Sequence, residues 1–182
     1  MLKIITLANP ERIKELAALI LRYSAFSAKK PAGEVAYYGK GTEEATPAQQ
    51  LAAAEWAQML YLEISSTAPT SNLGLALTWH REGGIAGFCD DLKVYRSGLA
   101  IGTSCKPGAN QPSRMIWLNA DQLDQLYDWL DNLQTSDGKQ TDTAVADSMT
   151  ITWTLSASGS RKPTTAESQK IMEFASLVFA SK

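Results

Sequence analysis

The sequence has few of the residues that most catalytic and metal sites need. Its 182 residues include a single histidine, His80, and only two cysteines, Cys89 and Cys105. His80 is the one conventional base near neutral pH, and a thiol enzyme built on either cysteine would lack a third, orienting group. Two cysteines and one histidine also leave a four-ligand zinc site incomplete unless carboxylates join them. We therefore expect no enzyme activity, no cofactor and no metal.

The chain also lacks an excess of charge of either sign and lacks long apolar runs. Seventeen basic and nineteen acidic residues give a net charge of −2, which does not favour a nucleic-acid partner. The most apolar stretch, 16–21, is far shorter than the ~20 residues of a membrane helix, so no transmembrane segment is expected. Residues 2–21 contain five charged side chains and do not form a secretory signal; a leader before residue 1 stays open.

Four segments combine a capping side chain with apolar residues at helical spacing, and each is predicted to be a helix. They begin at Asn9, at Thr46, at Asn119 and at either Thr164 or Thr165. Between the first two, residues 35–38 are a candidate short strand. In the third helix Trp129 lies beside the leucine stripe rather than on it, so it is predicted to be an exposed aromatic anchor.

Five segments are predicted to be strands, at 73–81, 90–95, 99–105, 115–118 and 149–156. The first and last alternate apolar with polar residues, which is typical of a sheet with one buried face. Because the strands follow one another, we expect an α+β fold with an antiparallel sheet of four to five strands and two covering helices. A helical pair at 1–70 is expected to pack on this 71–182 core as one compact unit.

One turn signal fixes the pairing of two predicted strands. Arg96-Ser97-Gly98 is typical of a three-residue hairpin loop with glycine in the left-handed conformation. Pairing the residues that flank this loop sets Cys89 directly opposite Cys105, at a separation that suits a disulfide. Such a bond would indicate an oxidising, extracytoplasmic or cell-surface location. Two reduced thiols in a cytoplasmic protein are the alternative.

A glycine-rich segment leads into the same hairpin. It matches neither a phosphate-binding loop nor a dinucleotide fingerprint, because strands flank it on both sides. It is either a plain connection in which glycine supplies positive φ or an exposed loop offered to a partner. Asp90 and Asp91, which follow it, are expected to be solvated surface charges. The candidate partner-binding residues are Glu82, Gly83, Gly84, Ile85, Ala86, Gly87 and Phe88.

From residue 75 onward the chain resembles the emfourin-like proteinaceous inhibitors of thermolysin-like metalloproteases. The resemblance rests on the segment 77–87, with its Gly-Gly-Ile-Ala-Gly run, and on a matching order of helix, strand and closing helix over about 110 residues. The longer arrangement is also similar to uncharacterised bacterial secreted proteins or lipoproteins. The cysteine pair and the first 70 residues depart from the small inhibitor pattern.

These observations favour a non-catalytic, monomeric protein-binding module. The resemblance implies a protease inhibitor whose partner is a secreted peptidase, with loop 82–88 as the contact. The alternative is a secreted structural or small-ligand-binding protein with aromatic residues around a pocket between sheet and helices.

Overall fold

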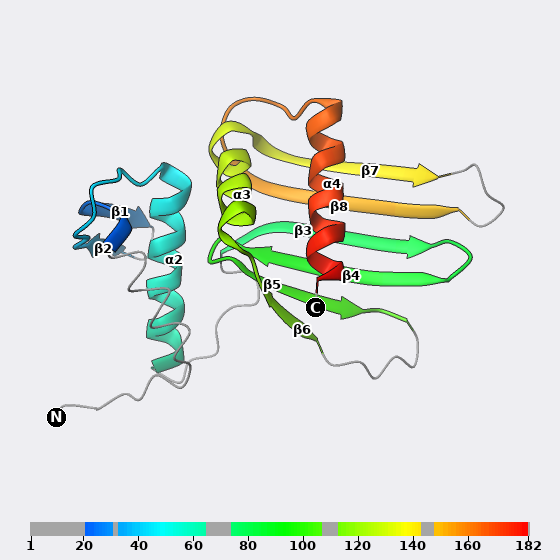
Figure 1. The fold of residues 1–182 in the computed structure, drawn as a ribbon, viewed down its shortest axis with the longest axis horizontal. Coiled ribbons are helices and arrows are strands. Elements are labelled where there is room, and N and C mark those ends of the chain that lie inside the picture. The colour runs from blue at the N-terminus through cyan, green and yellow to red at the C-terminus, as the bar shows by residue number, and fades with distance from the viewer. Residues whose placement is uncertain (1–20, 31–32, 65–73, 107–112, 143–147, 182) are drawn as a thin grey trace. The chain divides into compact units, whose positions relative to one another are not determined.

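The structure is a computed structural model that describes residues 21–30, 33–64, 74–106, 113–142 and 148–181. The chain divides into two compact units, Met1–Leu73 and Gly74–Lys182. Figure 1 shows the helices and strands of each unit.

The first unit contains a small sheet in addition to a helix. Strand β1 (Phe26–Lys30) pairs antiparallel with β2 (Gly33–Tyr37), and helix α2 spans Pro47–Ile64. Strand β2 confirms the candidate strand at 35–38, whereas β1 was not predicted. The predicted helix from Asn9 lies mostly in residues 1–20, outside the described residues. The described part of this unit therefore has one full helix and a β-hairpin, and the predicted helical pair stays a prediction because its first helix lies mostly outside the described residues.

The second unit is built on a six-stranded antiparallel sheet with the order β6-β5-β4-β3-β8-β7. Its strands are β3 (Leu75–Gly83), β4 (Phe88–Tyr95), β5 (Leu99–Ser104), β6 (Arg114–Trp117), β7 (Gln134–Asp142) and β8 (Met149–Ser158). Its helices are α3 (Ala120–Asn132) and α4 (Thr165–Ala180). The α+β class and the five predicted strands are confirmed, but the sheet has one strand more than the largest number expected.

The additional strand is β7, whose sequence is QTSDGKQTD. It contains no apolar residue and therefore gives no alternating pattern that would predict a strand. It forms because it pairs along β8 at one edge of the sheet, where most of its side chains are exposed to solvent.

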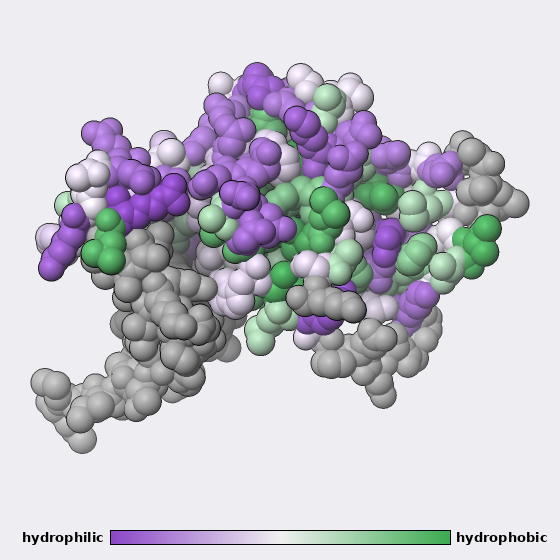
Figure 2. Space-filling view, viewed as in Figure 1, coloured by the Kyte–Doolittle hydropathy of each residue, from purple (hydrophilic) through white to green (hydrophobic). Residues whose placement is uncertain are grey.

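Helices α3 and α4 cover one face of the sheet (Figure 1). Both begin with the predicted capping boxes, Asn119 with Gln122 and Thr164 with Glu167. Their outer surfaces are hydrophilic over α3 and the first half of α4, whereas the C-terminal half of α4 also exposes apolar surface (Figure 2), including Leu177 at 69% exposure. The opposite face of the sheet, called the open face below, carries polar side chains in alternation with the core.

The core between helices and sheet is rich in aromatic rings. Trp79 of β3 is 1% exposed and lies 5.7 Å, ring to ring, from Phe179 of α4. Trp129 of α3 is 3% exposed and meets Phe174 of α4 edge-on at 5.3 Å. The prediction that Trp129 is an exposed anchor is therefore wrong. Its side of α3 faces α4, so the helix buries a wider surface than its leucine stripe indicated.

Candidate functional site

The glycine-rich segment forms the loop of the β3–β4 hairpin. Gly83 pairs with Phe88, and the Gly87 amide donates to the Gly84 carbonyl at 2.7 Å across the turn. Gly83 has φ +89°, and a Cβ atom there would collide with the Ser148 carbonyl oxygen. Only glycine fits this conformation and this approach. The loop leaves Ile85 86% exposed at its tip, and Figure 2 shows apolar surface at this end of the sheet.

Contacts with residues of the neighbouring strands and of the segment after β5 hold this loop in place. The Arg81 guanidinium lies over the Phe88 ring at 4.0 Å, on the face of the sheet that the helices cover. Lys106 Nζ donates to the Ala86 carbonyl at 2.9 Å and lies 5.9 Å from the Phe88 ring centre. The Gly84 amide donates to the Ser148 carbonyl at 3.3 Å. The loop is therefore fixed by neighbours on both sides, which limits the entropy that it would lose on binding.

Arg81 is itself fixed by Asp90, directly opposite on β4. Two of its guanidinium nitrogens donate to the same Asp90 carboxylate oxygen, and the two side chains are only 20% and 10% exposed. The expectation that Asp90 is a solvated surface charge is therefore wrong. Strand alternation turns Asp90 towards the helices, and its neighbour Asp91 remains on the open face at 44% exposure.

The two cysteines form the predicted disulfide at the base of the loop. Cys89 and Cys105 are bonded, with their Cα atoms 4.9 Å apart. The pairs Lys93–Ile101 and Asp91–Thr103 confirm the register derived from the turn, in which Gly98 has φ +86°. The bond ties the first residue after Phe88 to the end of β5. It is weakly compatible with an extracytoplasmic location.

His80 lies on the open face between two carboxylates. Its Nδ1 lies 2.9 Å from Asp91 Oδ1, and its Nε2 lies 3.5 Å from Glu82 Oε2. Partial burial lowers the pKa of the imidazole, but the hydrogen bonds and negative charges of Asp91 and Glu82 outweigh this effect and raise its pKa above the ordinary value. Folding therefore stabilises the charged form of His80 relative to the unfolded chain.

The raised pKa of His80 predicts a pH-dependent contribution to stability. Because the folded state binds this proton more tightly than the unfolded state, the contribution is complete below the unfolded pKa of about 6.5 and is lost as pH rises through the folded value. Urea denaturation at about pH 5 and about pH 8 should show this difference in the wild type and its loss in His80→Gln. An equal pH dependence in that variant would contradict the assignment.

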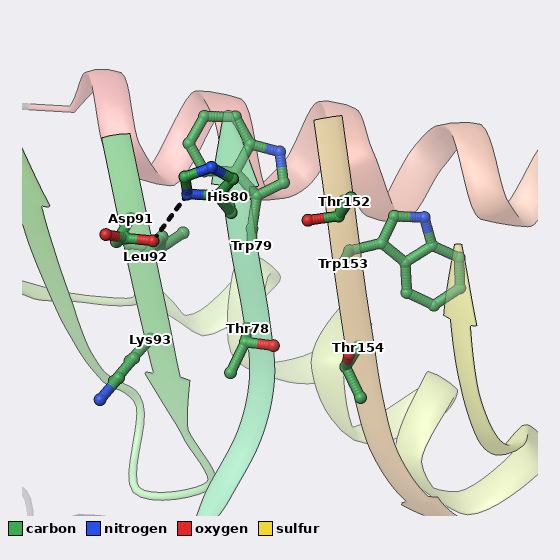
Figure 3. A pocket seen from close by; sticks show the side chains of 9 residues that line it. All are labelled: Thr78, Trp79, His80, Asp91, Leu92, Lys93, Thr152, Trp153 and Thr154. Carbon is green, nitrogen blue, oxygen red and sulfur yellow. Dashed lines mark hydrogen bonds and ion pairs between the residues drawn. The ribbon is translucent and has the colours of Figure 1, made fainter. Parts of the chain in front are cut away.

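A shallow hollow of about 210 Å³ lies on the open face beside His80 (Figure 3). Polar side chains from three strands line it together with core residues of the same strands: Thr78, Trp79, His80, Asp91, Leu92, Lys93, Thr152, Trp153 and Thr154. Ligand pockets usually measure ~300–1,000 Å³ and are mainly apolar. This hollow is smaller and is not the aromatic pocket between sheet and helices that a ligand-binding function would use.

Potential metal ligands also meet on the open face. Ligand atoms of His80, Asp91 and Cys105 all lie within 4.8 Å of one another. In the disulfide form Cys105 has no thiolate to offer, and the described residues include no free cysteine. The sequence did not predict this cluster, because the carboxylate that it needs becomes visible only when β3 is placed beside β4.

Sequence reasoning missed the residues that support the loop, namely Arg81, Asp90 and Lys106. A usable signal existed for two of them. If segment 83–88 is taken as a closed hairpin with Gly83 opposite Phe88, the same counting that paired the cysteines places Arg81 opposite Asp90 and His80 opposite Asp91.

Comparisons with known families, curated proteins and solved structures found no match for this chain. Within the described ranges, none of the helices has the length and apolar character needed to cross a membrane.

Proposed function

We propose that the protein is a non-catalytic binding module that presents loop 82–88 to a protein partner. The observation that carries the proposal is the exposure of Ile85, at 86%, on a loop that its surroundings hold in one conformation. A large aliphatic side chain at such a position is suited to be an anchor that fills an apolar pocket of a partner. Because neighbouring residues already hold the loop in one conformation, the loop loses less conformational entropy on binding. More of the contact energy then contributes to affinity.

The support consists of four kinds of contact around the loop. These are the Arg81–Phe88 stacking, the Lys106 bond to Ala86, the turn closed by Gly84 and Gly87, and the adjacent disulfide. Glu82, with a side chain 62% exposed, adds a negative charge beside the apolar tip. A partner site with an apolar pocket next to a cationic group would complement this loop.

The proposed partner is a secreted peptidase, and the protein would act as its inhibitor outside the cytoplasm. The support for this class is the resemblance of segment 77–87 to emfourin-like inhibitors together with the disulfide, which is usual in oxidising compartments. A bound loop of this kind would block the peptidase cleft without any chemical step on the inhibitor.

The proposal predicts inhibition of at least one member of a panel of secreted metallo- and serine peptidases. Ile85→Asp should weaken that inhibition by about 10–100-fold, because it removes the apolar burial of one large side chain and places a charge in the pocket. Inhibition constants from competition with a fluorogenic peptide would measure the effect.

Met115→Asp is a matched control for this experiment. Met115 is also a highly exposed apolar residue, at 74%, but it lies on β6 rather than on the loop. Its replacement should leave inhibition within about twofold of the wild type. Failure of the whole panel, or equal losses for Ile85→Asp and Met115→Asp, would contradict the proposal.

A further inference from the structure

The open face near the disulfide carries two adjacent rows of side chains from β3, β4 and β5. In one row His80 is opposite Asp91, and in the next row Glu82 is opposite Cys89. Cys105 follows β5 and is bonded to Cys89. Because residues two apart on a strand share a face, all five side chains belong to one surface patch.

The distances within this patch approach those of a tetrahedral metal site. The ligand atoms of His80, Asp91 and Cys105 lie within 4.8 Å of one another, and the sulfur of Cys89 is bonded to that of Cys105. Zinc–ligand bonds of about 2.0–2.3 Å place tetrahedral ligand atoms roughly 3.3–3.8 Å apart. Side-chain movements of about 1 Å would therefore bring His80, Asp91 and Cys105 to coordination distance. Cys89 lies outside this 4.8 Å group, so its sulfur must move further once the disulfide opens.

We propose that reduction of the Cys89–Cys105 disulfide creates a site for a zinc-class divalent cation, with Cys89, Cys105, His80 and Asp91 as its four ligands. Two thiolates, one imidazole and one carboxylate are ligands that zinc accepts in tetrahedral sites. The carboxylate that a site with two cysteines and one histidine requires is supplied by Asp91, directly opposite His80 on the neighbouring strand.

The redox step balances with a dithiol reductant. Its thiolate attacks one sulfur of the disulfide, its second thiol resolves the mixed disulfide, and two electrons and two protons pass to the cysteines as the reductant becomes a disulfide. Cys105 is exposed and therefore accessible to such a reagent. Binding of the cation then releases the two thiol protons and the proton of any charged imidazole.

Glu82 completes the arrangement as a positioning residue. Its Oε2 lies 3.5 Å from His80 Nε2, while His80 Nδ1 faces Asp91. If Nδ1 binds the cation, the Nε2 hydrogen can be donated to Glu82, which is the usual role of a carboxylate behind a metal-bound histidine. The base of the loop would then be held by a disulfide under oxidising conditions and by a metal ion under reducing conditions.

Anaerobic titration of the reduced full chain with Co²⁺ tests the proposal. We expect one ion per chain, a thiolate-to-cobalt charge-transfer absorption and the ligand-field bands of tetrahedral cobalt, all displaced by Zn²⁺. The oxidised chain should give none of these signals. His80→Gln and Asp91→Asn should each weaken Co²⁺ binding by at least ~10-fold. Loss of a residue that only supports a metal ligand already weakens binding by about 10–100-fold at such sites.

Lys93→Gln is the matched control, since Lys93 lies on the same face one row away from Asp91 and is not a proposed ligand. It should bind Co²⁺ as the wild type does. Absence of the charge-transfer band, or a band that survives unchanged in His80→Gln and Asp91→Asn, would overturn the four-ligand site. If the reduced chain loses its native circular dichroism, Zn²⁺ must restore it; failure to do so would equally overturn the proposal.

Discussion

Replacing Asp90 by alanine should lower the free energy of unfolding of the 74–182 unit by about 3 kcal/mol, the low end of the range for breaking a buried ion pair. The change leaves the Arg81 guanidinium without its carboxylate partner between Phe88, Trp79 and Phe179. Arg81 is 20% exposed and can recover part of its hydration, so the upper end of the range is not expected. Urea denaturation followed by tryptophan fluorescence would measure the loss, since four of the five tryptophans lie in this unit.

Asp91→Ala is the control for that measurement. Asp91 is the next residue of β4, but it lies on the open face with 44% of its side chain exposed and pairs with His80 near solvent. Exposed pairs contribute about 0–1 kcal/mol, so a change of that size is expected. Similar losses for Asp90→Ala and Asp91→Ala would contradict the different roles assigned to the two carboxylates.

Trp129→Ala should destabilise the same unit by about 3–5 kcal/mol, as removal of a buried indole usually does. The substitution leaves a cavity between α3 and α4 and removes the edge-on contact with Phe174. If Trp129 were the exposed anchor that the sequence suggested, the change would be small and partner binding would suffer instead. Denaturation midpoints of the isolated protein distinguish the two cases.

Trp117→Ala provides a matched comparison with the same pair of amino acids. Trp117 is 38% exposed on the edge strand β6, so part of its surface is already hydrated in the folded state. Its replacement should lower the free energy of unfolding by less than about 1.5 kcal/mol, below the usual effect of removing a fully buried aromatic ring. A larger effect at Trp117 than at Trp129 would reverse the assignment of core and surface.

The part of the fold that local chemistry determines was predictable from the sequence. If Arg96-Ser97-Gly98 is taken as a three-residue loop, it gives the observed register, which places the two cysteines opposite each other, whereas a two-residue turn would shift it. Both capping boxes likewise depend on residues three positions apart, so they required no knowledge of the tertiary structure. Strands with one buried face were recognisable because burial imposes alternation on their residues.

The features that were missed depend on neighbours distant in the sequence. Strand β7 has no apolar pattern, and only its pairing with β8 makes it a strand. Trp129 is buried because α3 packs against α4 as well as against the sheet. The leucine stripe of α3 indicates only one of these two contact surfaces, so it did not predict the burial of Trp129. Asp90 is buried because it pairs with Arg81 of the neighbouring strand β3, whose guanidinium lies against three aromatic rings. In each case the packing partner, and not the local propensity, decides the outcome.

The polar strand β7 has a consequence for the behaviour of the protein at high concentration. An open sheet exposes unpaired backbone groups along its two edge strands, and these can recruit strands of other chains into aggregates. Here one edge is β7, which carries Asp137 and Lys139 among exposed polar side chains, and the other edge, β6, is only four residues long. Charged and short edge strands are the usual protection against such association. The polar, charged sequence of β7 therefore opposes pairing between this edge and the strands of other chains.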